Sequence, residues 1–112
     1  MKHVLMEEIA LSEDGKIVKV LSNPSFKLIG LGFKKGQSLD KHSTSSKAIL
    51  IVRSGNVNFF INSEKYNLQS GSFFEIPENV EHEVKANIDS YLYLINFPTI
   101  LMQKITDIYS QK

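Results

Sequence analysis

The chain has no cysteine among its 112 residues, and neither sign of charge is in marked excess. The missing thiols exclude disulfides, thiolate metal sites and a cysteine nucleophile. There are 13 basic and 12 acidic residues, so nothing electrostatic favours direct binding to nucleic acid or to an anionic membrane. No apolar run approaches the length that spans a bilayer. Acidic residues stand where a secretory signal has its apolar core, so we expect a cytoplasmic protein.

Composition and turn spacing indicate one all-β domain. Apolar residues make up 42% of the chain and charged residues 22%, which is typical of a globular domain with a single core. Roughly nine short strands, with turns every 8–12 residues, favour a β-barrel or sandwich over an α/β fold. The expected strands lie within 2–11 and at 17–21, 26–33, 48–52, 57–61, 66–68, 73–76, 82–85 and 90–97. Gly30 and Gly32 are expected to mark a bulge or bend in the third of these strands.

Two stretches share a pattern in which one histidine follows a turn. The first runs from Gly36 through His42 into an apolar strand that stops at Gly55. The second runs from Gly71 through a proline turn to His82. If the chain is extended from position 42 to position 52, alternate residues share one face. The residues on that face are His42, Thr44, Ser46, Ala48, Leu50 and Val52, which is the pattern of an apolar cavity with a polar mouth.

These stretches resemble the two sequence motifs of the cupin superfamily. The residues that fit the motifs are Gly36, His42 and Gly55 in the first, and Gly71, Pro77 and His82 in the second. The resemblance implies a small cupin-type β-barrel, a double-stranded β-helix or jelly roll, with a site in the barrel mouth. It divides the single domain 1–112 into N-terminal strands (1–33), the two motifs (34–97) and a C-terminal segment (98–112). Small cupins commonly dimerise, so the resemblance also implies a homodimer.

The departures from the motifs concern the metal site. Cupins usually hold a metal with three histidines and one glutamate, but Thr44 and Ala48 replace the second histidine and the glutamate. His42 and His82 alone leave a divalent ion mostly hydrated. The carboxylates nearest to the histidines in sequence are at 40, 81 and 83, and those at 81 and 83 directly neighbour His82 and therefore point to the opposite face of a strand. Asn79 also replaces the inner glycine of the second motif, and Ala86 replaces its final asparagine.

The last segment, 98–112, changes from strand to helical periodicity. Leu101, Ile105 and Ile108 recur at helical spacing, and Thr99 is placed to cap the first turn. We expect a short C-terminal α-helix whose apolar face packs on its own barrel or on a second subunit.

Three functions are compatible with these residues. The leading hypothesis is a barrel that binds a small molecule, with His42, Thr44 and His82 as polar anchors and Leu50 and Val52 on the deeper wall. The metal site is then degenerate or absent, with no cofactor or a weakly bound divalent metal. A second hypothesis is a metal-dependent enzyme of the oxygenase or isomerase type, in which His42 and His82 gain a further ligand such as Gln37 or a carboxylate. A third is the effector-sensing module of a regulator that has no DNA-binding domain of its own. The residues do not decide whether a reaction is catalysed.

Overall fold

The computed structural model describes residues 3–22 and 25–97, and most of these form β-strands. Within these ranges there is also one short 3-10 helix, η1, at Met6–Glu8. The strands are β1 Ile17–Ser22, β2 Lys27–Phe33, β3 Ser38–His42, β4 Lys47–Ser54, β5 Asn56–Ile61, β6 Glu64–Gln69, β7 Phe73–Ile76, β8 His82–Ala86 and β9 Ser90–Phe97. No helix in this part of the chain is both long and apolar enough to cross a bilayer. The helix expected over 98–112 lies outside the described residues.

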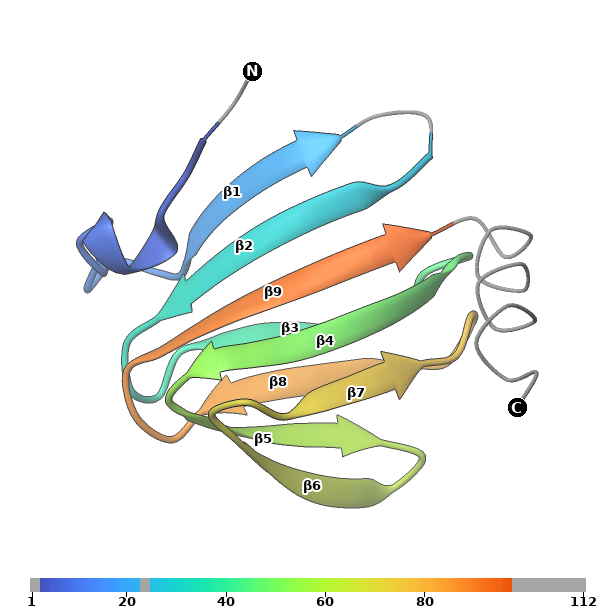
Figure 1. Cartoon of the computed structure of the whole chain (residues 1–112). Coiled ribbons are helices and arrows are strands. Elements are labelled where there is room, and N and C mark those ends of the chain that lie inside the picture. The colour runs from blue at the N-terminus through green and yellow to red at the C-terminus, as the bar shows by residue number, and fades with distance from the viewer. Residues whose placement is uncertain (1–2, 23–24, 98–112) are drawn as a thin grey trace.

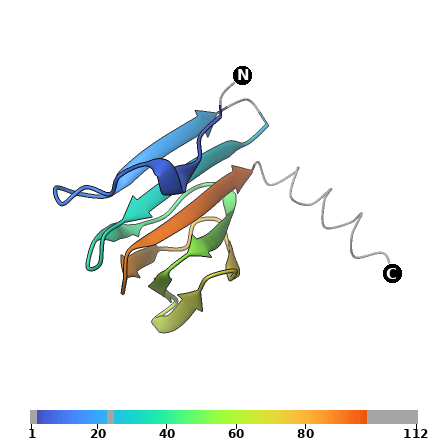
Figure 2. The same ribbon diagram turned by 60° about the vertical axis from the view of Figure 1, so that its left-hand side comes forward.

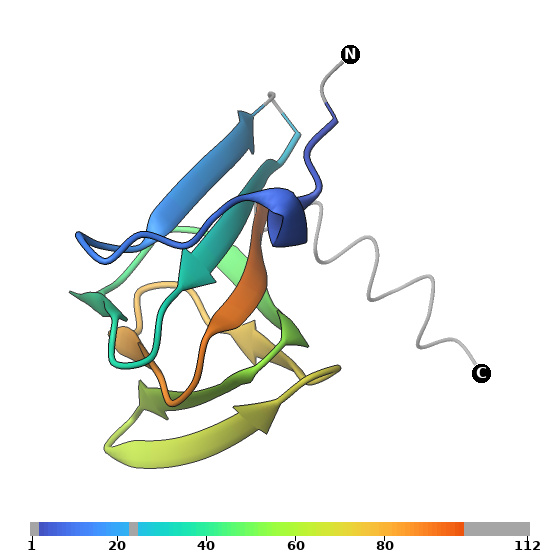
Figure 3. The ribbon, with the colours of Figure 1, turned by 90° about the vertical axis from the view of Figure 1, so that its left-hand side faces the viewer.

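Two antiparallel sheets face each other and enclose the core (Figures 1 and 3). One sheet has the strand order β1-β2-β9-β4-β7, and the other has the order β3-β8-β5-β6. Among its crossings between the sheets, the chain passes from β2 to the margin strand β3 on one side and between the margin strands β6 and β7 on the other. The two strand orders therefore run side by side, so that β9 lies over β8 and β4 lies over β5. This is the expected all-β barrel of the jelly-roll type, and that prediction is confirmed.

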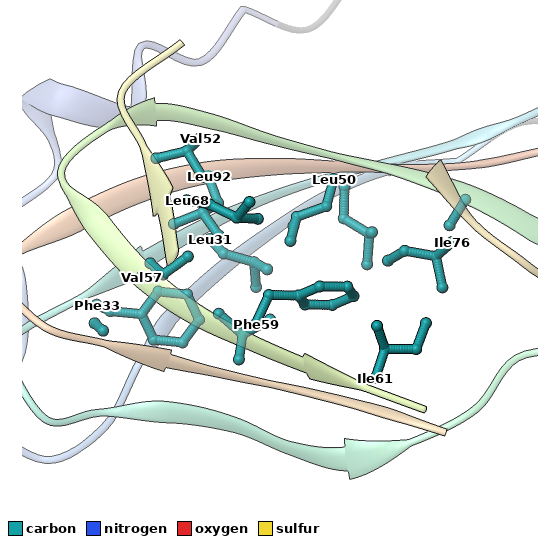
Figure 4. Close-up of a cluster of buried hydrophobic side chains, with 14 residues drawn as sticks. Leu31, Phe33, Leu50, Val52, Val57, Phe59, Ile61, Leu68, Ile76 and Leu92 are labelled. Atoms are coloured by element: carbon teal, nitrogen blue, oxygen red, sulfur yellow. The ribbon is translucent and has the colours of Figure 1, made fainter. Parts of the chain in front are cut away.

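The core follows from strict alternation of apolar residues along the central strands. In β4 the side chains of Leu50 and Val52 point inward and are buried, as those of Val57 and Phe59 are in β5. Figure 4 shows these side chains meeting between the sheets. Each fully buried side chain of this size contributes about 1.5–3 kcal/mol to folding through removal of apolar surface from water. The buried cluster consists of Leu31, Phe33, Ala48, Leu50, Val52, Val57, Phe59, Ile61, Leu68, Ile76, Val84, Ala86, Leu92 and Leu94.

The N-terminal segment differs from the prediction of a strand within 2–11. It forms η1 beside β2, as Figures 2 and 3 show, and Met6 is only 1% exposed there. A Cβ atom on Gly30 would lie 2.6 Å from the Met6 Sδ atom, and one on Gly32 would lie 2.8 Å from the Leu11 Cδ2 atom. The register of β1 with β2 is regular through both glycines, so of the expected bulge or bend the bulge is wrong. The glycines instead make room for the two side chains that cover β2 from outside.

The chain between His42 and Lys47 is not the continuous extended segment that was expected. β3 ends at His42 in one sheet, and β4 begins at Lys47 in the other. The intervening loop is tied to the turn before β8, because the Asn79 backbone N–H donates to the Thr44 carbonyl at 2.7 Å. Asn79 has a φ of 60°, in the left-handed region that asparagine tolerates better than most residues. This backbone conformation explains how asparagine replaces the glycine of the motif.

Candidate functional site

The two histidines meet at one end of the barrel. This is the end where β3, β5, β7 and β9 finish and where β4 and β8 begin, on the right of Figure 1; we call it the histidine end. His42 and His82 are direct cross-strand partners of β3 and β8, and their ring centroids are 4.3 Å apart at an angle of 61°. The β3–β8 register shifts between Leu39 and His42, which brings position 42 opposite position 82. The structure thus brings together the two predicted anchors that lie farthest apart in sequence.

Backbone carbonyls fix the orientation of both rings. The His42 Nδ1 atom lies 2.8 Å from the Asp40 carbonyl oxygen, and the His82 Nδ1 atom lies 3.0 Å from the Val80 carbonyl oxygen. A carbonyl oxygen only accepts hydrogen bonds, so each Nδ1 carries the proton in the neutral ring. Each Nε2 then has a lone pair available to a hydrogen-bond donor or to a metal ion. The pair therefore offers two acceptor nitrogens at the histidine end.

Burial keeps His82 neutral. The residue is 3% exposed, and its ring centroid lies 5.9 Å from that of Phe59, which is in the core. Removal from water lowers the pKa of His82 below the ordinary value of 6.5, and the charge of His42 lowers it further, while the Val80 carbonyl opposes both effects. At neutral pH this imidazole is therefore an uncharged polar group set against an apolar wall.

The remaining predicted site residues lie in different settings. Leu50 and Val52 are 1% and 0% exposed and belong to the core on β4, the opposite sheet from the histidines (Figure 4). The Thr44 hydroxyl donates to the Ser46 carbonyl oxygen at 2.9 Å within the loop that follows β3. A direct contact of these three residues with a ligand stays a prediction.

One polar residue of the histidine end was missed by sequence reasoning. The segment 90–97 reads as apolar on both faces, but Asn96 interrupts the inward face of β9, which Leu92 and Leu94 otherwise form. Asn96 is the cross-strand partner of Ala48, the position at which the cupin motif has glutamate. Its Oδ1 atom is buried and has no hydrogen-bond partner. A lone asparagine in an apolar strand was the signal that could have identified this residue.

The described residues do not complete a metal site of the usual cupin kind. Within 3–22 and 25–97 there is no group of three or more His, Cys, Asp or Glu residues that could hold a metal ion. Gln37, one of the suggested extra ligands, lies at the other end of the barrel, where its carbonyl accepts a hydrogen bond from the Ala86 N–H. Its side chain is also used, because Oε1 accepts from the Lys34 N–H and Nε2 donates to the Ser12 carbonyl.

A pocket of about 510 Å³ gives access to this region from outside the barrel. Its walls come from β8 and from the β5–β6 turn, and they include His82 and its cross-strand partner Ile61. Charged side chains, Lys41, Glu81 and Glu83 among them, form part of the lining. The buried histidine therefore lies next to a recess that has both polar and apolar lining residues.

The comparisons with known proteins agree with this architecture. Residues 33–112 match the family described as AraC-like ligand binding domain. The comparison with curated proteins gives no match.

Several solved structures have the same fold. An RmlC-like cupin protein from Desulfovibrio desulfuricans superposes with a TM-score of 0.79 at 22% identity, over 88% of this chain and 96% of that one. A conserved protein of unknown function from Streptococcus pyogenes gives 0.77 at 21% identity, over 88% and 90% of the two chains. A cupin superfamily protein from Desulfitobacterium hafniense gives 0.76 at 13% identity, over 80% and 84%. At these identities the likeness concerns the fold.

Proposed function

Because the chain belongs to the family of AraC-like ligand binding domains, a small cupin family, we propose that it binds a small molecule at the histidine end of its barrel. The observation that carries this proposal is the histidine pair, with ring centroids 4.3 Å apart and both Nδ1 atoms hydrogen-bonded to backbone carbonyls. Two oriented acceptor nitrogens beside an apolar core are the arrangement typical of a ligand pocket, in which few polar groups fix the orientation of a mainly apolar contact. Thr44 is proposed as a further polar anchor, and Leu50 and Val52 as the deeper wall.

A ligand screen that compares the wild-type protein with variants of the histidine pair tests this proposal. Thermal shift assays with a panel of small metabolites identify compounds that stabilise the wild-type protein, because a ligand that binds only the folded state raises its melting temperature. The His42→Ala/His82→Ala variant should lose these shifts, whereas the control His3→Ala should keep them, since His3 is exposed and outside the histidine end. Compounds that stabilise the double variant as much as the wild type would place the binding site elsewhere.

A metal-dependent cupin enzyme of the oxygenase or isomerase type is the second candidate. It is favoured by the Nδ1 contacts, because a histidine that ligates a metal usually donates its other ring N–H to a carbonyl or carboxylate. A bound divalent metal would polarise a substrate or supply a reactive oxygen ligand, and His42 and His82 would hold it. Against it stands the lack of a third ligand among the described residues. Elemental analysis distinguishes the two: near one equivalent of a transition metal, lost in His42→Ala/His82→Ala, would favour the enzyme, and we expect no such loss.

The family match also favours a role as an effector-sensing module. No helix-turn-helix occurs within 3–22 and 25–97, so this part of the chain would act on DNA only through a partner. Affinity purification of the tagged protein from its own cells, with and without a ligand from the screen, tests this role. Recovery of a DNA-binding protein in one of the two conditions would support it, and recovery of none would count against it.

We further propose a cytoplasmic homodimer. The outermost strand β1 supports this, because among the described residues it lies at the edge of its sheet and carries the partly exposed apolar side chains of Val18 and Leu21. Edge strands with exposed apolar residues commonly pair with another chain. Light scattering after size-exclusion chromatography gives the mass directly, and a Val18→Lys variant should shift the protein to monomer. A wild-type protein that is already monomeric would refute the dimer.

A further inference from the structure

Asn96 is an amide on the inner face of β9 at the histidine end, in the sheet opposite the one that carries the imidazole pair. Inward and outward residues alternate along β9, so Asn96 shares the inner face with Leu92 and Leu94. It stands opposite Ala48 of β4 on one side and opposite Lys27 of β2 on the other. Because β9 lies over β8, the inner face of β9, on which Asn96 lies, is turned toward the sheet that carries His82. Figure 1 shows β9 finishing at the end where β8 begins.

The unpartnered oxygen of Asn96 is unusual in this molecule. The buried hydroxyl of Ser90 donates to the Ile88 carbonyl at 2.7 Å and accepts from the Asn56 N–H at 3.1 Å. On the outer face of the other sheet, the amides of Asn67 and Asn87 are hydrogen-bonded to neighbouring asparagines. The Asn96 Oδ1 atom alone is buried with no partner among the described side chains. Such an atom costs about 1–3 kcal/mol of folding free energy, and it calls for a partner that is not part of the protein.

The acceptors proposed at this end are imidazole and amide atoms rather than carboxylates. His82 is 3% exposed, and its Nδ1 atom lies 3.0 Å from the Val80 carbonyl oxygen, which leaves Nε2 as the acceptor. Asn96 is a neutral amide, and Ala48, its cross-strand partner, places no carboxylate where the cupin motif has one. Acceptors of this kind satisfy hydroxyl or N–H donors. Their lone pairs face a carboxylate that has no proton to donate, and they give a metal cation no negative charge to offset dehydration.

From these observations, and resting on the proposed small-molecule site, we propose that Asn96 is a ligand-contacting residue. Its Oδ1 atom, with the Nε2 atoms of His42 and His82, accepts hydrogen bonds from an uncharged ligand that carries neighbouring donor groups. The ligand has an apolar body that lies against the inner wall and a donor-bearing edge that faces the three acceptors. Asn96 thus selects for neutral donors and against carboxylates.

Two probes that share one ring test this assignment. cis-Cyclohexane-1,2-diol carries two neutral donors, and cyclohexanecarboxylate carries an anionic acceptor on the same apolar body. Both are titrated into ¹⁵N-labelled wild-type protein, and the backbone amide shifts of His42, His82 and Asn96 report binding at the site. We expect the diol to shift these signals and the carboxylate to bind at least about tenfold more weakly.

Three variants separate the role of the amide from a structural role. Asn96→Leu keeps the side-chain volume and removes the acceptor, and it should raise the dissociation constant for the diol about tenfold. It should not lower the melting temperature, because it also removes a buried unpartnered oxygen. Asn96→Asp keeps an acceptor oxygen and should bind the diol within about threefold of wild type. The control Asn67→Leu, on the outer face of the other sheet, should bind the diol unchanged; should Asn96→Leu not fold, Asn96→Ala replaces it.

The outcomes distinguish this inference from the proposed function on which it rests. If the diol binds at the histidines and Asn96→Leu binds it equally well, Asn96 has no ligand contact and the site still stands. If the carboxylate binds more tightly than the diol, or the diol causes no shift at the three residues, the preference for neutral donors is wrong. If ligands from the metabolite screen shift signals only far from His42 and His82, the site itself is wrong.

Discussion

Lowering the pH should destabilise the folded protein through His82, and the size of the effect can be bounded. Burial holds the pKa of His82 in the folded protein below 6.5, whereas the unfolded chain has the ordinary value. Below pH 6.5 the unfolded state therefore binds a proton that the folded state resists, and the free energy of unfolding falls as the pH falls. The slope from this one group is at most about 1.4 kcal/mol per pH unit, and it ends once the pH passes the folded pKa. Above pH 6.5 the group contributes no pH dependence.

Urea unfolding curves at constant ionic strength, from about pH 7.5 to about pH 5, measure this effect. Carboxylates also titrate in that range, so the informative quantity is the difference between wild type and His82→Gln at each pH. We expect this difference to shrink as the pH falls, by up to about 1.4 kcal/mol between pH 6.5 and 5.5, with unchanged m values. The exposed residue His3 provides the matched control, and His3→Gln should keep the wild-type curve. A difference between wild type and His82→Gln that is constant with pH would refute the reasoning that burial keeps His82 neutral.

Two further substitutions test the metal motif and the turns. Ala48→Glu restores the carboxylate of the cupin motif, and at a position that is 1% exposed it should cost several kcal/mol without metal. Excess Ni²⁺ should then raise its melting temperature, through a site of two histidines and one carboxylate. The absence of any such rise, or the same rise after an added His82→Ala change, would show that position 48 does not reach the pair. Gly55→Ala should destabilise the protein by more than the about 1–2 kcal/mol of a left-handed alanine, because φ is 108° there and the added Cβ would clash with the side chain of Ser90. Gly71→Ala is the matched control for urea unfolding, with a φ of 90° and no atom within 4 Å of the added Cβ, so equal losses in the two variants would contradict the steric argument.

The fold was predictable because the central strands have one buried face. Apolar residues recur at every second position in 48–52 and again in 57–61, and Gly55 marks the turn between the two strands. The observed strands β4 and β5 contain these positions with alternating burial. The prediction of an N-terminal strand was wrong because the segment before residue 11 has no such continuous buried face. It packs on the outside of β2 through single side chains such as Met6. Single contacts of that kind leave no periodic pattern in the sequence.

The histidine pair of the candidate site was predictable from the sequence, but the layout around the pair was not. The two motifs placed one histidine after each turn, and both lie at the same end of the barrel. The sequence also favoured an unbroken strand from His42 to Val52, because nothing between them forbids extension. The break comes from tertiary contacts, since the loop turns over to the Asn79 N–H and β4 joins the other sheet. Asn96 was missed because one polar residue does not change the apolar periodicity by which the strand was predicted. That its side-chain oxygen has no hydrogen-bond partner is visible only in the structure.

Two costs in stability at this end of the barrel support the proposed site, although two residues of the cupin metal motif are replaced. A site that had lost all function would be expected to drift toward apolar residues, because His82 in a wall beside Phe59 and Ile61 is less stable than a hydrophobic residue of similar volume. The unpartnered oxygen of Asn96 is a second local cost at the same end. At the far end of the barrel the buried polar residue Ser90 has all its hydrogen bonds within the protein. Two such costs at one end of the barrel, while the described residues otherwise satisfy their buried side-chain polar groups, support the proposed functional site.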